Sequence, residues 1–174
     1  MIILGIDPGS RITGYGIIRN RSNKMEYLGS GHIKVKGEQL PQKLGYIFQQ
    51  LSTIIEQYHP QQMGIENVFM HKNADSALKL GQARGAAICA GYQAGLEVFE
   101  YAPREIKLTI VGKGGALKQQ VQHMVSRLLG LREELQADEA DALAIAICHA
   151  QHQSMTDKTG IPAQAFSRNR RSRR

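Results

Sequence analysis

Cysteine is scarce in this chain, and long apolar runs are absent. The 174 residues include two cysteines, Cys89 and Cys148, both in alanine-rich segments and neither in a CxxC pair. We therefore expect two reduced, buried thiols, with neither a disulfide nor a cysteine-ligated metal. No apolar run reaches the length of a membrane span, and the first one meets Asp7 before it could serve as a signal sequence. These features predict a soluble protein of the cytoplasm.

Histidine pairs at metal-ligand spacing are missing as well. The six histidines include no HxH or HxxxH pair. His149 follows Asp138 by eleven residues, which on one helix puts the two about 16 Å apart, too far to share an ion. We interpret the other five as surface or hydrogen-bonded residues, and the sequence offers no histidine-based metal site. These five are His32, His59, His71, His123 and His152.

The positive charge is concentrated near the carboxyl end. The net charge is +7, and five arginines among the last seven residues supply most of it: Arg168, Arg170, Arg171, Arg173 and Arg174. We expect one globular domain over residues 1–152, followed by a basic, disordered tail over residues 153–174. Such a tail modestly favours a nucleic-acid partner, although an acidic protein partner or plain solvation would account for it equally well.

Hydrophobic periodicity predicts a mixed α/β domain. Strand patterns cover residues 2–6, 14–19, 25–35, 63–69 and 98–101, and helix patterns cover residues 40–58, 74–95, 118–129 and 137–151. The first three strands follow one another as an antiparallel meander. The later strands are joined through helices, which favours a parallel arrangement with the first strand.

Two of these strands end in the same way, with Gly-Ile followed by an acid. The stretch "LGID" ends at Asp7, and the stretch "MGIE" ends at Glu66. A charge at the end of a buried strand is costly unless something pairs with it. If the two strands are parallel neighbours, both acids emerge at the same carboxyl edge of the sheet, where open α/β folds bind ligands.

The stretch "ADEADALAIAI" adds two further acids on one helix face. Asp138 and Asp141 are three residues apart and share that face, whereas Glu139 points about 100° away and is expected to be solvated. Four converging carboxylates repel one another unless cations bridge them, and Mg²⁺ is a hard ion that prefers oxygen ligands. Two such ions about 4 Å apart can hold both the attacking water and the leaving oxygen of a phosphodiester displacement. Each acid alone could be a turn or cap residue, but together they favour a metal-dependent site.

Small residues gather in two places. Gly9, Gly14 and Gly16 follow Asp7, and we expect them to let a turn form and a phosphodiester approach the carboxylate. The predicted helix 74–95 carries a stripe of small residues at four-residue spacing: Ala77, Gly81, Gly85 and Cys89. The stripe could admit a helix of a second protomer or pack against the sheet of its own protomer.

Four segments resemble the RuvC family of Holliday-junction resolvases: "GIDPGSRITGYG", "IENVFMHKNADSALKLGQARGAA", "FEYAPREIKLTIVGKG" and "QADEADALAIAI". The resemblance runs from residue 1 to about residue 150, with the segments in family order. It implies a ribonuclease H-like α/β fold with a mixed five-stranded sheet flanked by helices. It also implies a homodimeric, Mg²⁺-dependent endodeoxyribonuclease that nicks two opposed strands of four-way junction DNA in recombination and DNA repair.

The resemblance assigns roles to individual residues. It implies catalytic and metal-binding roles for Asp7, Glu66, Asp138 and Asp141, the same four acids, with two Mg²⁺ ions and Mn²⁺ as a substitute. It implies that Phe69 stacks on a base near the junction centre, although a core phenylalanine at a strand end would look the same. It implies that Lys107 and Lys118 face the DNA backbone. The RuvA–RuvB branch-migration complex is the protein partner that the resemblance implies.

Three other functions are compatible with parts of the sequence. An actin-like or sugar-kinase-like phosphotransferase also opens with an Asp-x-Gly turn, but it needs a second lobe and a second phosphate loop, for which the chain is too short. A ribonuclease H-like nuclease on another branched or hybrid substrate would use a similar set of carboxylates. A non-catalytic junction-binding protein would have no physical reason to keep four mutually repelling acids. The resolvase is therefore the favoured function.

Overall fold

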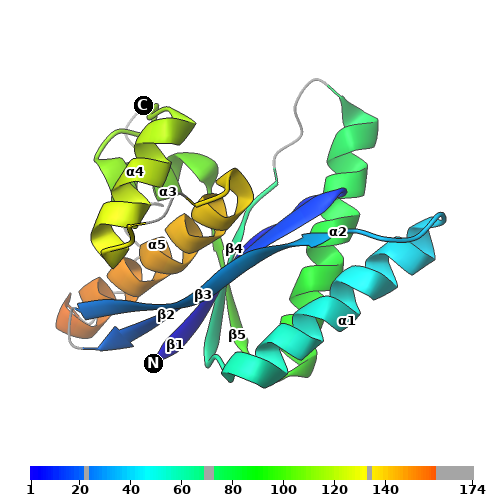
Figure 1. Cartoon of the computed structure of the whole chain (residues 1–174), viewed down its shortest axis with the longest axis horizontal. Helices are drawn as coiled ribbons and strands as arrows, with labels where there is room; N and C mark the ends of the chain where they lie inside the picture. Colours follow the sequence, from blue (N-terminus) through cyan, green and yellow to red (C-terminus); the bar gives the residue numbers. More distant parts are fainter. Residues whose placement is uncertain (22–23, 69–72, 133–134, 160–174) are drawn as a thin grey trace.

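One five-stranded sheet forms the centre of the computed structural model, which describes residues 1–21, 24–68, 73–132 and 135–159. Its strands are β1 (Ile2–Asp7), β2 (Ile12–Arg21), β3 (Lys24–Lys34), β4 (Gln62–Glu66) and β5 (Glu97–Tyr101). They lie in the order β3-β2-β1-β4-β5 (Figure 1). β1 and β2 pair antiparallel, as do β2 and β3, while β4 is parallel to both β1 and β5. The predicted mixed sheet of five strands is confirmed.

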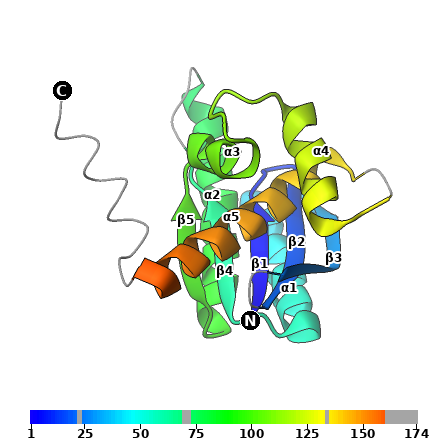
Figure 2. The same ribbon diagram turned by 90° about the vertical axis from the view of Figure 1, so that its left-hand side faces the viewer.

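Helices cover both faces of the sheet. They are α1 (Leu40–Tyr58), α2 (Ala74–Gln93), α3 (Pro103–Val111), α4 (Lys118–Leu129) and α5 (Ala137–Thr159). Helices α1 and α2 lie on one face, whereas α3, α4 and α5 lie on the other (Figure 1), and α5 crosses the strands obliquely (Figure 2). Each face has its own cluster of buried side chains. Within the described residues, none of these helices is both long and apolar enough to cross a membrane.

Alternation along β1 decides which of its side chains face α5. Leu4 and Ile6 belong to the core beneath α1 and α2, and Ile3 belongs to the core beneath α5. Because side chains alternate along a strand, Gly5 and Asp7 lie on the same face as Ile3. The strand therefore directs its last side chain, a carboxylate, to the face that carries α5.

Glycines let α5 pack almost directly on the sheet backbone. A Cβ atom on Gly5 would lie 2.1 Å from the carbonyl oxygen of Ala142, and one on Gly14 would lie 2.1 Å from that of Asp138. A Cβ on Gly16 would also collide with α5, because it would lie 2.7 Å from a leucine side chain of that helix. The expectation that Gly14 and Gly16 leave room for a phosphodiester is wrong, because the first turns of α5 fill that space.

Helix α3 is absent from the prediction, although its local signals are present in the sequence. Pro103 stands at the first helical turn, Ile106 and Ile110 are buried one turn apart, and Gly112 ends the helix with φ of 78°. A proline start and a glycine end are common helix boundaries. The segment is short, and its two buried residues alone do not establish a helical period.

Helix α5 continues to Thr159, beyond the predicted end at residue 151. Contacts of the added turn explain the difference: the ring of His152 packs edge-on against Tyr101, and Gln153 Nε2 donates a hydrogen bond to Gln62 Oε1 over 3.3 Å. The expected boundary at residue 152 therefore falls inside a helix, and disorder from residue 153 is wrong as far as Thr159. The arginine-rich segment expected after it lies outside the described residues.

The small-residue stripe of α2 faces solvent. Gly81 and Gly85 have open space around them, and Cys89 is exposed, so the expectation that Cys89 is buried is wrong. The other cysteine, Cys148, is fully buried as predicted. The opposite face of α2, which includes the buried Ala87, covers the sheet. Of the two alternatives for the stripe, packing against the protomer's own sheet is excluded.

We predict that Gly5→Ala destabilises the protein because its methyl group must push α5 off the sheet. The expected loss in free energy of unfolding is roughly 1–3 kcal/mol, the usual cost of overpacking a core. The matched control is Gly45→Ala, in the exposed middle of α1 with nothing nearby, which should raise stability by roughly 0.5–1 kcal/mol. Urea unfolding of both variants measures the difference, and equal midpoints would contradict the packing argument.

Candidate active site

The acids of β1 and β4 end up side by side at one edge of the sheet. Ile6 and Ile65 are partners in the parallel pairing of β1 with β4, so the residues that follow, Asp7 and Glu66, are neighbours. Glu66 follows the buried Ile65 and, like Asp7, lies on the face that carries α5. The shared edge predicted from "LGID" and "MGIE" is confirmed.

Helix α5 brings a third carboxylate to this edge. Asp7, Glu66 and Asp141 line one open cavity of about 240 Å³. Asp138 lies one turn earlier on α5, and its negative charge contributes to raising the pKa of Asp7. Ile106, on α3, belongs to the apolar part of the cavity wall. The structure therefore gathers the four predicted acids around one end of the sheet, with three of them in the cavity itself.

The carboxylates oppose one another's ionisation. Burial raises the pKa of Asp7 to about 7, and the charges of Glu66, Asp141 and Asp138 add to the increase. Burial and the charge of Asp141 likewise raise the pKa of Glu66. Since a like charge in a partly desolvated site disfavours the ionised form, the site has more negative charge than its surroundings neutralise.

Two lysines supply the nearest positive charge. Lys118, at the start of α4, places Nζ 3.1 Å from Oδ2 of Asp141, and this carboxylate raises the pKa of Lys118. Lys107 lines the same cavity from α3, and its charge and that of Lys118 offset part of the rise in the pKa of Glu66. Both lysines therefore lie at the acidic edge, Lys107 on α3 and Lys118 at the start of α4.

The carboxylates have the chemistry to bind a divalent cation, but their side chains are not arranged around a common point. Within the described part of the chain, no three histidine, cysteine, aspartate or glutamate side chains are placed to hold one ion together. Asp141 turns toward Lys118 instead. Carboxylate oxygens are the ligands that hard divalent cations prefer, and the raised pKa of Asp7 marks a site where added positive charge is stabilising. The donor set therefore fits a hard divalent cation by its chemistry, and Asp141 is held by Lys118 in this structure.

The prediction that Glu139 is solvated is wrong. Ser30 donates a hydrogen bond to its Oε2 over 3.2 Å, and Nδ1 of His32 lies 3.6 Å from its Oε1. The helical period correctly turns Glu139 away from Asp138, but strand β3 occupies the space on that side. Glu139 therefore ties the first turn of α5 to the sheet.

His149 is a buried, hydrogen-bonded histidine. Its Nδ1 lies 2.7 Å from the hydroxyl of Tyr101, and its Nε2 lies 2.8 Å from Oε1 of Gln62. Burial lowers the pKa of His149 to about 4, so the ring is neutral at pH 7. It connects α5 to β4 and β5.

Phe69 lies outside the described residues, so its predicted base-stacking role stays a prediction. The predicted strand 63–69 ends at Glu66.

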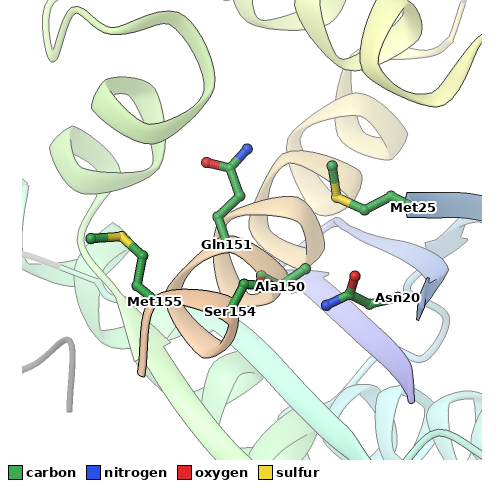
Figure 3. A pocket seen from close by; sticks show the side chains of 6 residues that line it. All are labelled: Asn20, Met25, Ala150, Gln151, Ser154 and Met155. Atoms are coloured by element: carbon green, nitrogen blue, oxygen red, sulfur yellow. The ribbon is translucent and has the colours of Figure 1, made fainter. Parts of the chain in front are cut away.

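A larger cavity of about 310 Å³ lies along the second half of α5 (Figure 3). Its lining residues come from β2, β3 and α5: Asn20, Met25, Ala150, Gln151, Ser154 and Met155. None of these side chains carries a charge or a strong metal ligand, so this cavity does not compete with the acidic edge as an active site.

Comparisons with known proteins identify a match over most of the chain. The family model described as crossover junction endodeoxyribonuclease RuvC matches residues 3–149. The proteins of that name from Tolumonas auensis and Enterobacter sp. are 61% and 60% identical, covering 87% and 88% of this chain and 88% and 90% of theirs. Thermus thermophilus RuvC in complex with Holliday junction substrate is similar in structure, with TM-score 0.83 and 32% identity over 89% of this chain and 96% of that chain. The ribonuclease H-like fold is thereby confirmed.

We predict that Asp7→Asn stabilises the metal-free protein above pH 7. The unfolded carboxyl ionises near pH 3.8 and the folded one near pH 7, so wild-type stability falls as pH rises across that interval. The variant lacks this fall and should be more stable at pH 8 by about 1–2 kcal/mol. Urea unfolding in EDTA from pH 4 to pH 8 measures the difference.

Asp75→Asn is the matched control for this charge removal. Asp75 is an exposed carboxylate paired with Lys79 on α2, so the expected change is within about 0.5 kcal/mol at every pH. Parallel stability curves for Asp7→Asn and wild type would contradict the assigned strain at Asp7.

Proposed function

Because this chain belongs to the RuvC family of crossover junction endodeoxyribonucleases, we propose that it resolves Holliday junctions by paired nicks in opposed strands. The observation that supports this most directly is the meeting of Asp7, Glu66 and Asp141 in one cavity with Lys107 and Lys118 beside them. The nucleases of this family depend on metal ions. A phosphodiester needs both the metal-binding acids and the phosphate-binding cations that this edge offers.

Asp7, Glu66, Asp138 and Asp141 would hold the metal, which we propose to be two Mg²⁺ ions, with Mn²⁺ as a substitute. When bound, these ions supply Lewis-acid stabilisation of the attacking and leaving oxygens. The strand ends hold Asp7 and Glu66 in place, while α5 carries the other two acids to them. Hydrolysis would leave a 5′-phosphate and a 3′-hydroxyl, the ends that a ligase can join.

The two lysines would bind the DNA backbone next to the scissile phosphate. Lys118 is exposed and can exchange its contact with Asp141 for a phosphate oxygen. That exchange would release Asp141 for metal binding at the moment when DNA arrives. Lys107, half-buried in the cavity wall, would stay in place and orient the same strand.

The proposed assembly is a homodimer formed through the exposed face of α2. Leu78 and Tyr92 are 63% and 80% exposed, and Gly81 and Gly85 between them leave room for a second helix. An apolar, small-residue helix face of this kind is costly to leave in water and permits close helix packing. Twofold symmetry would then present two acidic edges to two strands of one junction.

Two further assignments rest on the family membership alone. We propose that the protein works in the cytoplasm of a bacterial cell, where the chromosome lies. We also propose the RuvA–RuvB branch-migration complex as its protein partner.

We predict that Glu66→Gln and Asp141→Asn each lower junction cleavage by about 10²-fold or more, because the charge that holds the metal is lost. Binding of the junction should persist, since the lysines remain. The measurement is a cleavage assay on a synthetic four-way junction and on a linear duplex, in Mg²⁺, Mn²⁺ or EDTA, alongside a binding assay.

Glu56→Gln is the matched control, because this acid is exposed on α1, which covers the other face of the sheet. Its cleavage rate should stay within about threefold of wild type. Normal cleavage by Glu66→Gln would refute the proposed site, and nicking of the linear duplex at the same rate would refute the junction substrate.

We predict that Leu78→Glu combined with Tyr92→Glu converts the protein from dimer to monomer, because two charges would be buried in the proposed interface. Light scattering after size exclusion should give about twice the 19.3 kDa chain mass for wild type and one chain mass for the variant. Leu128→Glu, at an exposed leucine of α4, should remain dimeric. A monomeric wild type would contradict the proposal.

A further inference from the structure

Arg84 of α2 reaches across to the end of β4, where Glu66 stands. Its Nε donates a hydrogen bond to the backbone carbonyl of Glu66 over 3.1 Å. Its Nη2 donates to Oδ1 of Asn67 over 3.0 Å and lies 2.7 Å from Oε1 of Glu100. We propose that Arg84 is a positioning residue for the Glu66 carboxylate. The proposal rests on the assignment of Glu66 to the active site.

Arg84 binds β4 at the end of its pairing with β1. Ile65 is the last residue of β4 that pairs with β1, and Glu66 pairs with Tyr101 of β5 on its other side only. One residue later, the backbone N–H of Asn67 still donates to the carbonyl of Tyr101 over 2.8 Å. Because the sheet holds this end of β4 from one side, the two hydrogen bonds from Arg84 restrain the backbone that carries Glu66.

The three contacts need the shape of a guanidinium group. Nε–H and one N–H of Nη2 point the same way, and they bind the two acceptors on consecutive residues, Glu66 and Asn67. The same Nη2 also forms an ion pair with Glu100. A lysine has one nitrogen at the end of its chain and lacks this rigid fork, so Arg84→Lys keeps the charge and loses the geometry.

Arg84 acts on Glu66 through its backbone rather than through charge. The positive charges that lower the pKa of Glu66 come from Lys118 and Lys107. The charge of Arg84 is paired with Glu100, and its side chain is 18% exposed. Loss of the fork should therefore move the carboxylate without removing a neutralising charge from the cavity.

The helix that supplies Arg84 is also the helix proposed to form the dimer. Its exposed face carries Gly81 and Gly85, which flank Arg84 in sequence. A hydrogen-bonded side chain thus links the position of α2 to the position of Glu66. Docking of a second protomer on α2 would fix the helix and, through Arg84, the carboxylate that binds metal.

The test compares Arg84→Lys with wild type in four measurements: single-turnover junction cleavage, the Mg²⁺ concentration for half-maximal rate, junction affinity, and the rise in melting temperature on adding Mg²⁺. We expect cleavage to fall by about 10- to 100-fold, the usual cost of a misplaced catalytic group. The half-saturating Mg²⁺ concentration should rise, and the Mg²⁺-induced gain in melting temperature should shrink. Junction affinity should stay unchanged, which a general loss of structure would not allow.

Arg19→Lys is the matched control, since Arg19 forms an Arg–Glu pair with Glu26 on the far strands of the sheet, 3.0 Å apart. If Arg84→Lys fails to fold, Asn67→Ala replaces it. This variant removes one acceptor of the fork and should change the same readouts in the same direction, by about 3- to 10-fold in rate. Values for Arg84→Lys, or for Asn67→Ala in its place, that equal those of Arg19→Lys would overturn the proposal.

Glu66→Gln, measured in parallel, separates this inference from the active-site assignment. If Glu66→Gln cleaves normally, the assignment of the site is wrong, whatever Arg84 does. If Glu66→Gln is inactive and Arg84→Lys is normal, the site stands and the positioning role is wrong.

Discussion

The close contact between α5 and the sheet backbone determines where the acidic side chains lie. Gly5 and Gly14 bring α5 against β1 and β2 with no side chain between them. The helix can then place Asp138 and Asp141 next to the carboxylates of the strand ends. A larger residue at either glycine would lift the helix and move two acids away from the other two. The same packing therefore builds both the core and the candidate active site.

This arrangement stores electrostatic strain at the edge of the sheet. Burial and neighbouring carboxylates raise the pKa of Asp7 to about 7, so the folded protein resists full ionisation of its own site. The large apolar cores on both faces of the sheet supply the stability that tolerates such a cluster. Lys118 relieves part of the repulsion by pairing with Asp141. A cation at this edge would be stabilised by the excess negative charge.

Several hydrogen bonds between distant elements support the acidic edge. Glu139 joins α5 to β3, His149 joins it to β4 and β5, and Arg84 joins α2 to the end of β4. Each of these side chains bonds across elements that are distant in the sequence. They support the candidate site, whose four acids come from two strands and one helix.

The sequence by itself determined the five strands, four of the five helices that the structure describes, the mixed sheet and the four acids, because these depend on local periodicity and on repeats such as Gly-Ile-acid. Asp7 and Glu66 could be predicted to meet because parallel strands share a carboxyl edge. Only the tertiary structure decided which neighbours surround each residue. In the folded protein, Glu139 is hydrogen-bonded, Gly14 and Gly16 pack against α5, and Cys89 is exposed. Whether a side chain faces water or another element depends on chain segments that are far away in sequence. Local sequence patterns do not indicate which of those segments will pack against it.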